Sequence, residues 1–422
     1  MLIPGESSFF RADRLTDRKA FNQARISSEP AANHTAASHL FNRPPQVARP
    51  HPRVSSMLTQ AQIAHYLVAD SLASAESIID GDFEVMEASR RNRNFKVLSD
   101  RGPSYLLKQQ RDASSWDSVA NEARVYRFLQ EESAGDVLLR YIPRVVKYEP
   151  SEGMLIVELL RNSSDLFEYC QKCNRIPVRA VASLGHALSS LHRITGAALE
   201  AARHSGFKGH YPGAISIHRP GIAMFRDASS ANLQVIRIVQ NTPGFADSLD
   251  RLRDNWRIDS MIHNDVKWDN CVVFLDKGGR AHMDLKIVDW EFASLGDSCW
   301  DAGAVFGAFL GSWILSIPVS GTEAPDHFLE LARYPLSRMH RAIRVFWHTY
   351  ARGREFDRAG SAESLLRAVR YGAARLIQTA FEQMQHSSVL TGNVVCLLQL
   401  SFNVLQRPRE AAAQLLGLQG EC

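Results

Sequence analysis

Residues 261–270, MIHNDVKWDN, gather a histidine, a lysine and several acidic or amide side chains in one short stretch of chain. The stretch lies between the moderately apolar NWRIDSMI and the strand-like CVVFLD, which indicates a loop between two packed segments. Such loops are where a scaffold presents polar atoms for binding or catalysis. Asp and Asn are also common turn residues, so a polar turn that closes a hairpin is the alternative.

A second group of polar residues could act together with this loop. Asp289 ends the apolar run LKIV and is followed by Trp290 and Glu291. The oxygens of Asn270 and Asp289, on adjacent segments of one hairpin, could hold Mg²⁺, which prefers a few carboxylate or amide oxygens and completes its shell with water and phosphate. Asp265 then remains available to accept a proton from an attacking hydroxyl.

A lysine and a glutamate upstream could complete the set. Lys108 lies at the end of the strand-like SYLLKQQ, and Glu122 lies in the helix-like segment that follows. As a pair they would hold the lysine extended towards phosphate oxygens. Each residue alone is better explained as a surface charge, but the ordered set in matching local structure favours chemistry.

The apolar patterns predict a strand-rich half followed by a helix-rich half. Helical spacing runs from Met57 to residue 79. Short β-type runs and one helix come next: strands at 83–88, 94–100 and 104–110, a helix at 114–132, and strands at 142–150 and 153–160. From about residue 165 helices dominate, for example at 178–194, apart from a strand pair at 271–276 and 285–291.

These motifs resemble the aminoglycoside phosphotransferase and choline kinase family over roughly residues 60–400, and less closely the protein-kinase signature. HNDVKWDN is similar to the family's catalytic loop. IVDWEFASLGDSCWDAG is similar to its metal-binding strand and the G-D-x-x-x-W-D segment that follows, here Gly296, Asp297, Trp300 and Asp301. The resemblance implies an α+β, bilobal, protein-kinase-like fold. Residues 57–157 would form a nucleotide-binding N-lobe with a small antiparallel sheet and one helix, and 158–422 a larger, mainly helical C-lobe with the catalytic loop and acceptor-binding helices.

The resemblance also implies ATP and Mg²⁺ as cofactors and a role for each matching residue of the catalytic loop. Asp265 would be the catalytic base, and Asn270 and Asp289 would be the Mg²⁺ ligands. His263 would brace the loop, and Asp301 would hydrogen-bond its backbone.

The nucleotide would meet residues of the N-lobe. By resemblance, Lys108 would contact the α- and β-phosphates with Glu122 as its partner. The backbone of the hinge residues Glu158, Leu159 and Leu160 would meet adenine.

The sequence departs from the family pattern at two places. The phosphate-covering turn, residues 89–94, has no glycine, so Arg90, Arg91 and Arg93 together with Asn94 would supply charge and polar contacts, or the turn is displaced. Lys267 stands where many small-molecule kinases of this family have histidine or glutamine. It could neutralise charge on the γ-phosphate during transfer, or be a solvated turn lysine.

Composition limits the class of protein. A hydrophobic content of 45% suits a sizeable core, and a net charge of +4 does not argue for a nucleic-acid or membrane partner. No apolar run approaches the roughly 18 residues of a spanning helix, and the N-terminus lacks the features of a secretory signal. Cys170 and Cys173 form a C-x-x-C without a second pair at zinc spacing, so we expect ordinary thiols in a reducing, cytoplasmic compartment.

The favoured function is ATP-dependent transfer of the γ-phosphate to a hydroxyl of a small molecule. A protein kinase is one alternative, but the ten residues between Asp289 and Trp300 leave no room for a long activation loop. A catalytically silent, kinase-shaped binding protein is the other, and the glycine-free turn is its support. The oligomeric state is not indicated.

The acceptor is indicated only in outline. The C-terminal helices carry more Arg than Asp plus Glu, which argues against a polycationic aminoglycoside. Sugars, amino alcohols, nucleosides and peptide-like natural products stay open. Four side chains of these helices either add aromatic surface to the acceptor site or pack in the core: Trp347, His348, Tyr350 and Tyr371.

Residues 1–56 are rich in Pro, Ser, Ala, Asn and Arg without apolar periodicity, so we expect a disordered extension, with Met57 as a possible start of translation. A chain that starts at Met57 should therefore melt within about 2 °C of the full-length protein, because the extension buries little apolar surface. Scanning calorimetry of the two chains measures the difference. A larger fall in Tm would show that the extension packs on the folded body.

Overall fold

The protein is described by a computed structural model, which covers residues 58–88, 92–110, 118–133, 135–276, 282–318 and 328–421. The chain divides into two compact units. The sheet unit contains the described residues of Pro44–Cys173 and Asp269–Ala293, and the helical unit contains those of Asn174–Trp268 and Ser294–Cys422. The predicted extension at 1–56 lies outside the described residues, and the predicted lobe boundary at 157/158 stays a prediction.

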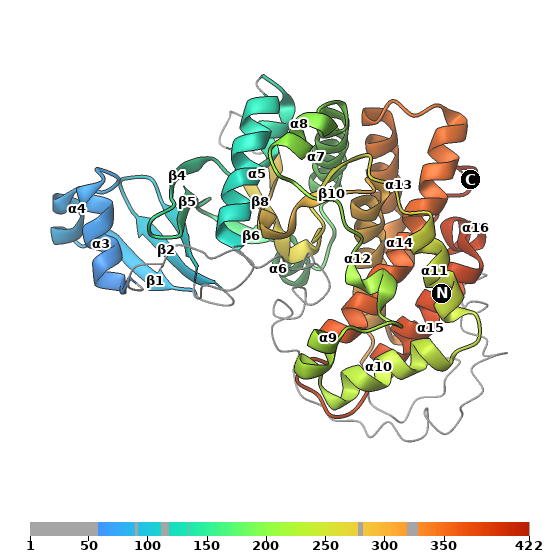
Figure 1. The fold of residues 1–422 in the computed structure, drawn as a ribbon. Coiled ribbons are helices and arrows are strands. Elements are labelled where there is room, and N and C mark those ends of the chain that lie inside the picture. Colours follow the sequence, from blue (N-terminus) through green and yellow to red (C-terminus); the bar gives the residue numbers. More distant parts are fainter. Residues whose placement is uncertain are drawn as a thin grey trace. The chain divides into compact units, whose positions relative to one another are not determined.

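The first part of the sheet unit is a five-stranded antiparallel sheet with helices (Figure 1). In chain order the elements are α3 (Gln60–Ala69), α4 (Ala75–Ile79), β1 (Phe83–Glu87), β2 (Arg93–Ser99), β3 (Tyr105–Gln109), α5 (Ser118–Glu132), η2 (Val137–Tyr141), β4 (Val145–Glu149) and β5 (Met154–Glu158). The strands pair in the order β1-β2-β3-β5-β4. The predicted series of three strands, a helix and two strands is confirmed.

The helical spacing predicted from Met57 to residue 79 corresponds to two helices. The chain leaves α3 at Ser71, whose φ is 57°, and Ser74 then caps α4 by accepting a hydrogen bond from the Ser77 N–H. Ile63 and Leu67 of α3 are fully buried in a core cluster with side chains of the sheet: Phe95, Val97, Tyr105, Leu107, Met154 and Ile156. The apolar face of α3, with Ile63 and Leu67, therefore packs this short helix against the sheet.

The rest of the sheet unit is a second, three-stranded sheet with short helices. Its elements are β6 (Ser163–Asp165), α6 (Leu166–Cys173), η4 (Trp268–Asn270), β8 (Cys271–Asp276), β9 (His282–Ile287) and η5 (Trp290–Phe292). The strands pair antiparallel in the order β6-β8-β9. The predicted strand pair is confirmed, and its turn at 277–280 lies outside the described residues.

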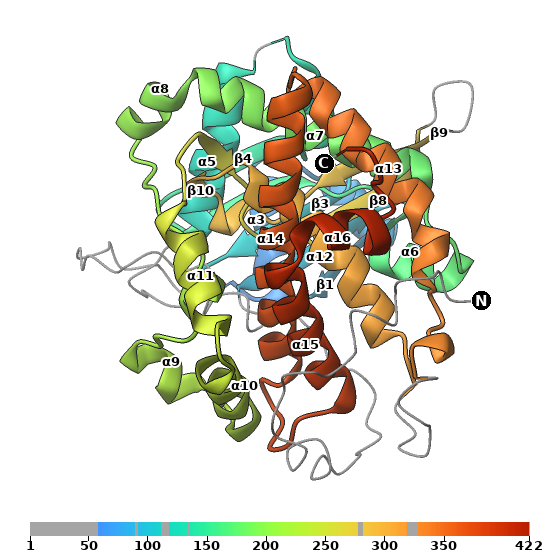
Figure 2. The same cartoon turned by 90° about the vertical axis from the view of Figure 1, so that its right-hand side faces the viewer.

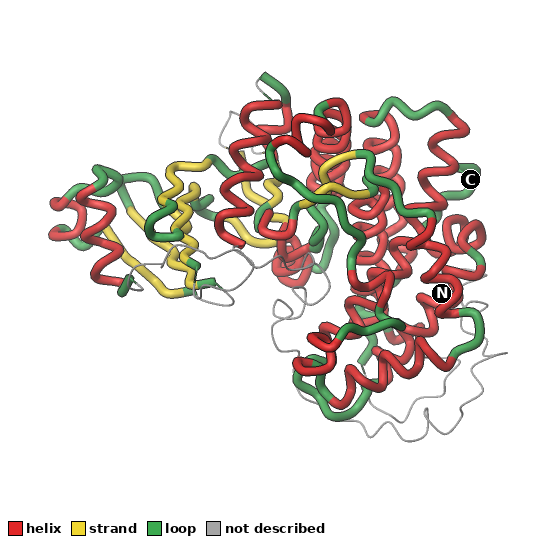
Figure 3. Tube along the Cα trace, in the orientation of Figure 1, coloured by secondary structure: helices red, strands yellow, loops and turns green. Residues whose placement is uncertain are grey.

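The helical unit is almost entirely α-helical in its described residues (Figures 2 and 3). Its elements are α7 (Val178–Ala197), α8 (Leu199–His204), η3 (Gly213–Ser216), α9 (Ile222–Asp227), α10 (Ser230–Asn241), α11 (Phe245–Asp254), β7 (Ser260–Ile262), β10 (Ser294–Gly296), α12 (Cys299–Leu315), η6 (Phe328–Leu331), α13 (Leu336–Gly353), α14 (Arg358–Gln383), α15 (Gly392–Gln406), α16 (Pro408–Glu410) and a π-helical turn, η7 (Ala411–Leu415). The predicted α+β fold, with a small antiparallel sheet and a larger helical part, is confirmed. Across the described ranges, no helix has both the length and the apolar character needed to cross a membrane.

Glycines set how closely α12 and α14 pack. A Cβ atom at Gly303 would lie 2.5 Å from the Ala368 carbonyl oxygen, and one at Gly372 would lie 3.0 Å from the Gly303 carbonyl oxygen. The two helix backbones are therefore in direct contact, which only residues without a side chain allow. A Cβ at Gly307 would lie 2.8 Å from the Cβ of Arg375. The same helix crossing therefore fixes the position of the Arg375 Cβ.

Gly303→Ala is expected to lower the Tm, because the added methyl group would force α12 and α14 apart at a cost of about 1–3 kcal/mol. Gly311→Ala is the matched control on the same helix, since its Cβ would meet nothing closer than 3.9 Å. The control should gain up to about 1 kcal/mol from better helix propensity. Thermal melts followed by circular dichroism compare the two. Equal Tm values would show that the helices adjust at the crossing.

Candidate active site

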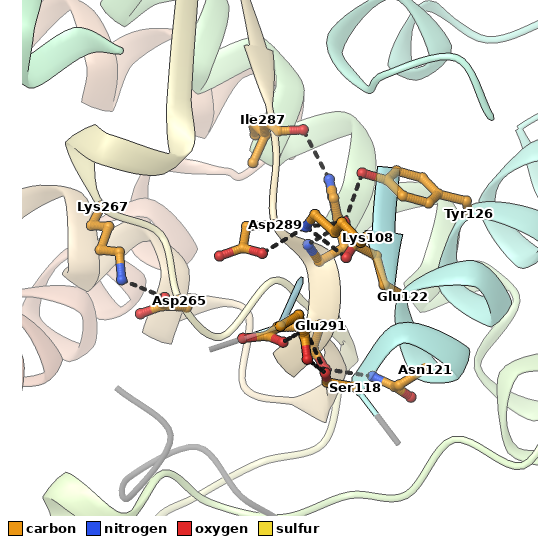
Figure 4. Close-up of polar contacts among 12 residues, drawn as sticks. Lys108, Ser118, Asn121, Glu122, Tyr126, Asp265, Lys267, Ile287, Asp289 and Glu291 are labelled. Atoms are coloured by element: carbon orange, nitrogen blue, oxygen red, sulfur yellow. Dashed lines mark hydrogen bonds and ion pairs between the residues drawn. The ribbon is translucent and has the colours of Figure 1, made fainter. Parts of the chain in front are cut away.

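Lys108 joins three segments of the sheet unit in one ion cluster (Figure 4). Its Nζ donates to the two carboxylate oxygens of Glu122 at 2.9 and 2.7 Å and to Oδ1 of Asp289 at 2.8 Å. Lys108 comes from β3, Glu122 from α5, and Asp289 from the residues just after β9. The predicted contact between Lys108 and Glu122 is present, and Asp289 is a further partner.

The surrounding negative charges keep the Lys108 ammonium protonated although it is buried. The side chains of Lys108 and Glu122 are 7% and 1% exposed, and that of Asp289 is 32% exposed. Burial by itself disfavours the ammonium, but the negative charges of Asp289, Glu122 and Glu291 outweigh it, so the pKa of Lys108 lies above its ordinary value. Burial and the nearby Glu122 also raise the pKa of Tyr126, whose hydroxyl donates to Glu122 Oε1 at 3.1 Å.

Helix α5 also holds the segment that carries Asp289. The Asn121 side chain donates to the carbonyl oxygens of Glu291 and Ala293 at 2.9 and 3.2 Å. The Trp290 N–H points to Glu122 Oε1 at 3.4 Å. Asp289 itself has a φ of 68°, a left-handed conformation that is uncommon for residues other than glycine. Contacts on both sides therefore hold a strained residue in place.

Asn270 and Asp289 lie at the same end of the β8–β9 hairpin. Cys271 pairs with Ile287 in the antiparallel ladder, and the Asn270 carbonyl accepts the Val288 N–H at 2.9 Å. The described residues contain no group of three or more His, Cys, Asp or Glu side chains that could hold a metal ion. Two protein oxygens completed by water and phosphate are a donor set that suits Mg²⁺, so the residues fit the predicted ion.

The predicted hinge is at the end of β5. The Glu158 N–H donates to the Arg144 carbonyl, and the Leu159 N–H donates to the Ser104 carbonyl, both at 2.9 Å. These two N–H groups are therefore already hydrogen-bonded within the sheet unit. Leu160 is the one hinge residue whose N–H makes no hydrogen bond to another described residue. The prediction that the hinge backbone meets adenine therefore narrows to the Leu160 N–H and the hinge carbonyls.

Two residues of the turn that was predicted to cover the phosphates lie in a strand. Arg93 and Asn94, which we placed in the turn, are the first two residues of β2, because pairing with β3 continues to them and sets Asn94 opposite Lys108. The Arg93 guanidinium lies 3.2 Å from the Glu87 carboxylate. Residues 89–91, including Arg90 and Arg91, lie outside the described residues. The nucleotide contacts of Arg93 and Asn94 stay predictions.

In the helical unit, the carboxylate of Asp301 holds the predicted catalytic loop. Oδ2 accepts the His263 N–H at 2.7 Å, and Oδ1 accepts the Asn264 N–H at 3.0 Å, so the predicted backbone contact is present. His192 Nε2 lies 3.1 Å from Oδ2, and the other nitrogen of that ring lies 2.9 Å from the Tyr350 hydroxyl. Asp301 and His192 are fully buried.

Asp265 is buried and faces two cations. Its Oδ2 accepts from Lys267 Nζ at 2.8 Å, and its Oδ1 lies 3.6 Å from Arg375 Nη2 (Figure 4 shows the first contact). The Asp265 N–H donates to His263 Nδ1 at 3.3 Å, which is how His263 contacts the loop. A carboxylate that is 1% exposed needs such partners. The alternative of a solvated turn lysine for Lys267 is wrong, because its side chain is 14% exposed and bound to Asp265.

Two functional candidates on α14 were missed by the sequence prediction. Arg375 lies within the mostly apolar AARLIQTAF and is buried. A buried arginine requires a charged or polar partner. An arginine within an apolar helical segment is therefore the sequence signal that could have identified it. Glu382 is half-buried. Burial and the nearby Asp265 raise its pKa, while Lys267 and Arg375 act in the opposite direction.

The aromatic residues suggested for the acceptor site are mostly core. Trp347, Tyr350 and Tyr371 are at most 1% exposed, so packing is the right explanation for these three. His348 is exposed. Of the four, only His348 stays a prediction for the acceptor site.

Several solved structures of kinases are similar to this chain. Choline kinase LicA from Streptococcus pneumoniae is 14% identical with a TM-score of 0.40, covering 74% of this chain and 99% of that one. A choline/ethanolamine kinase family protein from Mesorhizobium loti is 16% identical with a TM-score of 0.43, covering 86% and 100%. Amicoumacin kinase hAmiN, in complex with AMP-PNP, Ca²⁺ and Ami, is 12% identical with a TM-score of 0.47, covering 81% and 95%.

No curated protein matches this chain in sequence. Residues 82–326, more than half of the chain, match the Phosphotransferase enzyme family (APH). The matched range includes every residue of the Lys108 cluster and of the catalytic loop. The chain therefore belongs to the Phosphotransferase enzyme family.

Proposed function

We propose that this protein is an ATP-dependent phosphotransferase that moves the γ-phosphate to a hydroxyl of a small molecule, in a cytoplasmic setting. The observation that carries the proposal is the Lys108 ammonium held between Glu122 and Asp289. A strand, a helix and a loop far apart in sequence supply these side chains, and no packing requirement demands a buried cation there. Membership of the phosphotransferase family supports the same activity.

In this proposal the sheet unit binds the nucleotide. Lys108 contacts the α- and β-phosphates, and Glu122 and Tyr126 keep its side chain extended. Asn270 and Asp289 hold Mg²⁺, which when bound neutralises charge on the phosphates. Adenine meets the hinge at Leu160.

The helical unit supplies the base. The acceptor oxygen attacks the γ-phosphorus, the bond between that phosphorus and the β-phosphate oxygen breaks, and Asp265 takes the hydroxyl proton. Lys267, bonded to Asp265, neutralises charge that develops on the transferred group.

Asp265→Asn keeps the shape of the side chain but removes its ability to take a proton. We expect ATP–Mg²⁺ binding close to wild type and a fall in kcat of about 10²-fold or more. Binding is measured by calorimetry, and turnover is measured on an acceptor selected by a thermal-shift screen of hydroxylated metabolites in the presence of ATP–Mg²⁺. If Asp265→Asn abolishes nucleotide binding, its role as base is wrong.

Asp289→Asn should instead weaken nucleotide binding that depends on Mg²⁺, because an amide is a poorer ligand for a hard cation than a carboxylate. Calorimetric titration with ATP in the presence and absence of Mg²⁺ measures this. Equal affinities with and without Mg²⁺ in the wild type would remove Asp289 from the metal site. A wild-type protein that binds no ATP would favour the silent, kinase-shaped binding protein instead.

Lys108→Ala and Glu122→Ala are expected to weaken ATP binding, the first more than the second. The double variant should lose less than the sum of the two single losses, because the residues share one contact and act as a unit. Kd values for ATP–Mg²⁺ from calorimetry give the coupling directly. Strictly additive losses would mean that the pair has no joint role at the nucleotide.

A further inference from the structure

We propose that Arg375 is a positioning residue for the Asp265 base, through which helix α14 fixes the catalytic loop. The inference rests on the proposed function, since it assigns Asp265 the role of base. Arg375 is 110 positions away from Asp265 in the sequence, and it is 6% exposed. A cation buried to this degree requires specific partners, and two of its partners, Asp265 and Val266, belong to the loop.

One nitrogen of the guanidinium contacts both the side chain and the backbone of the loop. Nη2 donates to the Val266 carbonyl oxygen at 3.3 Å and lies 3.6 Å from Asp265 Oδ1. The second distance is too long for a hydrogen bond, so Arg375 acts on the carboxylate by charge. It therefore compensates the buried base electrostatically while holding the next peptide group by a direct bond.

The guanidinium is itself held on two further sides. Nη1 donates to Gln378 Oε1 at 2.7 Å, and the Gln378 amide donates to Glu382 Oε1 at 2.8 Å. The guanidinium carbon lies 5.7 Å from the centre of the Trp300 ring, whose N–H donates to the Asn264 carbonyl at 3.3 Å. The planar guanidinium makes several contacts at once and so fixes the loop relative to α14. A lysine ammonium cannot make the same set of contacts.

The packing of α14 makes this anchor rigid. The Cβ of Arg375 lies against Gly307 of α12, where a side chain would have no room. Without the guanidinium, Asp265 would keep Lys267 as a partner but the Val266 carbonyl would lose its bond to α14. A displacement of the base by about 1 Å can lower a rate by about 10²-fold.

Three variants test the assignment. Arg375→Met removes the charge and the fork but keeps a long side chain, and Arg375→Lys restores the charge alone. Arg367→Met is the matched control on the same helix, because Arg367 pairs with the fully buried Asp297 at 3.2 Å and not with the catalytic loop. The measurements are calorimetric binding of ATP–Mg²⁺, kcat on the screened acceptor, and hydrogen exchange of the Trp300 indole N–H in protein labelled with ¹⁵N-tryptophan.

For Arg375→Met we expect kcat to fall about 10-fold or more, the Kd for ATP–Mg²⁺ to stay within about 2-fold, and the Trp300 indole to exchange at least about 10-fold faster. Arg375→Lys should recover part of the kcat. Arg367→Met should lower the Tm but leave kcat and Trp300 exchange near wild type. Unchanged kcat and exchange in Arg375→Met, or equal changes in both Met variants, would overturn the assignment. If the wild type binds no ATP, the proposed function fails, whereas the exchange rates still decide whether Arg375 holds the loop.

Discussion

The hydrogen bonds from the His263 and Asn264 N–H groups to the buried carboxylate of Asp301 determine where the proposed catalytic loop lies. A fully buried carboxylate is stable only when charged or polar donors surround it, and here the loop backbone supplies two of them. The loop is therefore tied to the first turn of α12. Asp265 comes next after Asn264 in the chain, so its carboxylate is placed from a fixed point rather than from a mobile loop.

In the sheet unit, too, a buried charge is held by partners from other elements, but here the charge is positive. Lys108 is a buried cation that is held by Glu122 and Asp289 from two other elements. Buried ion pairs seldom add net stability, because the cost of removing both charges from water offsets their attraction. Apolar side chains of similar size would stabilise the sheet unit as well or better. The cluster is thus best explained by what an extended, permanently charged lysine can bind, and phosphate is the ligand that its chemistry favours.

Local sequence patterns were sufficient to predict the helices and strands. They were not sufficient to predict contacts between residues that are far apart in the sequence. The strands and α5 were predicted from alternation and helical spacing. Five residues were chosen as candidate site residues from their type and their place in those elements, and their roles stay predictions: Lys108, Glu122, Asp265, Asn270 and Asp289. Arg375 was missed because apolar periodicity predicts that a helix face is buried, but it does not predict which residues that face contacts. The length of a strand depends on its partner. The pairing with β3 extends β2 from the predicted start at Asn94 to Arg93, so neither residue belongs to the turn. Three aromatic residues of α13 and α14 were core for the same reason: burial depends on neighbours far along the chain.

Internal ion pairs also change which charges α13 and α14 can present to an acceptor. Counting along α13 and α14 gave an excess of Arg, which argued against a polycationic substrate. Two of these arginines are already neutralised inside the protein, Arg367 by Asp297 and Arg375 by Asp265. Only charge that is left after internal pairing can attract or repel a ligand. On α14 the half-buried Glu382, whose pKa is raised by burial and by Asp265, adds an acidic group and not a basic one near Asp265. A polycationic acceptor therefore belongs again among the candidates, beside sugars, amino alcohols, nucleosides and peptide-like natural products.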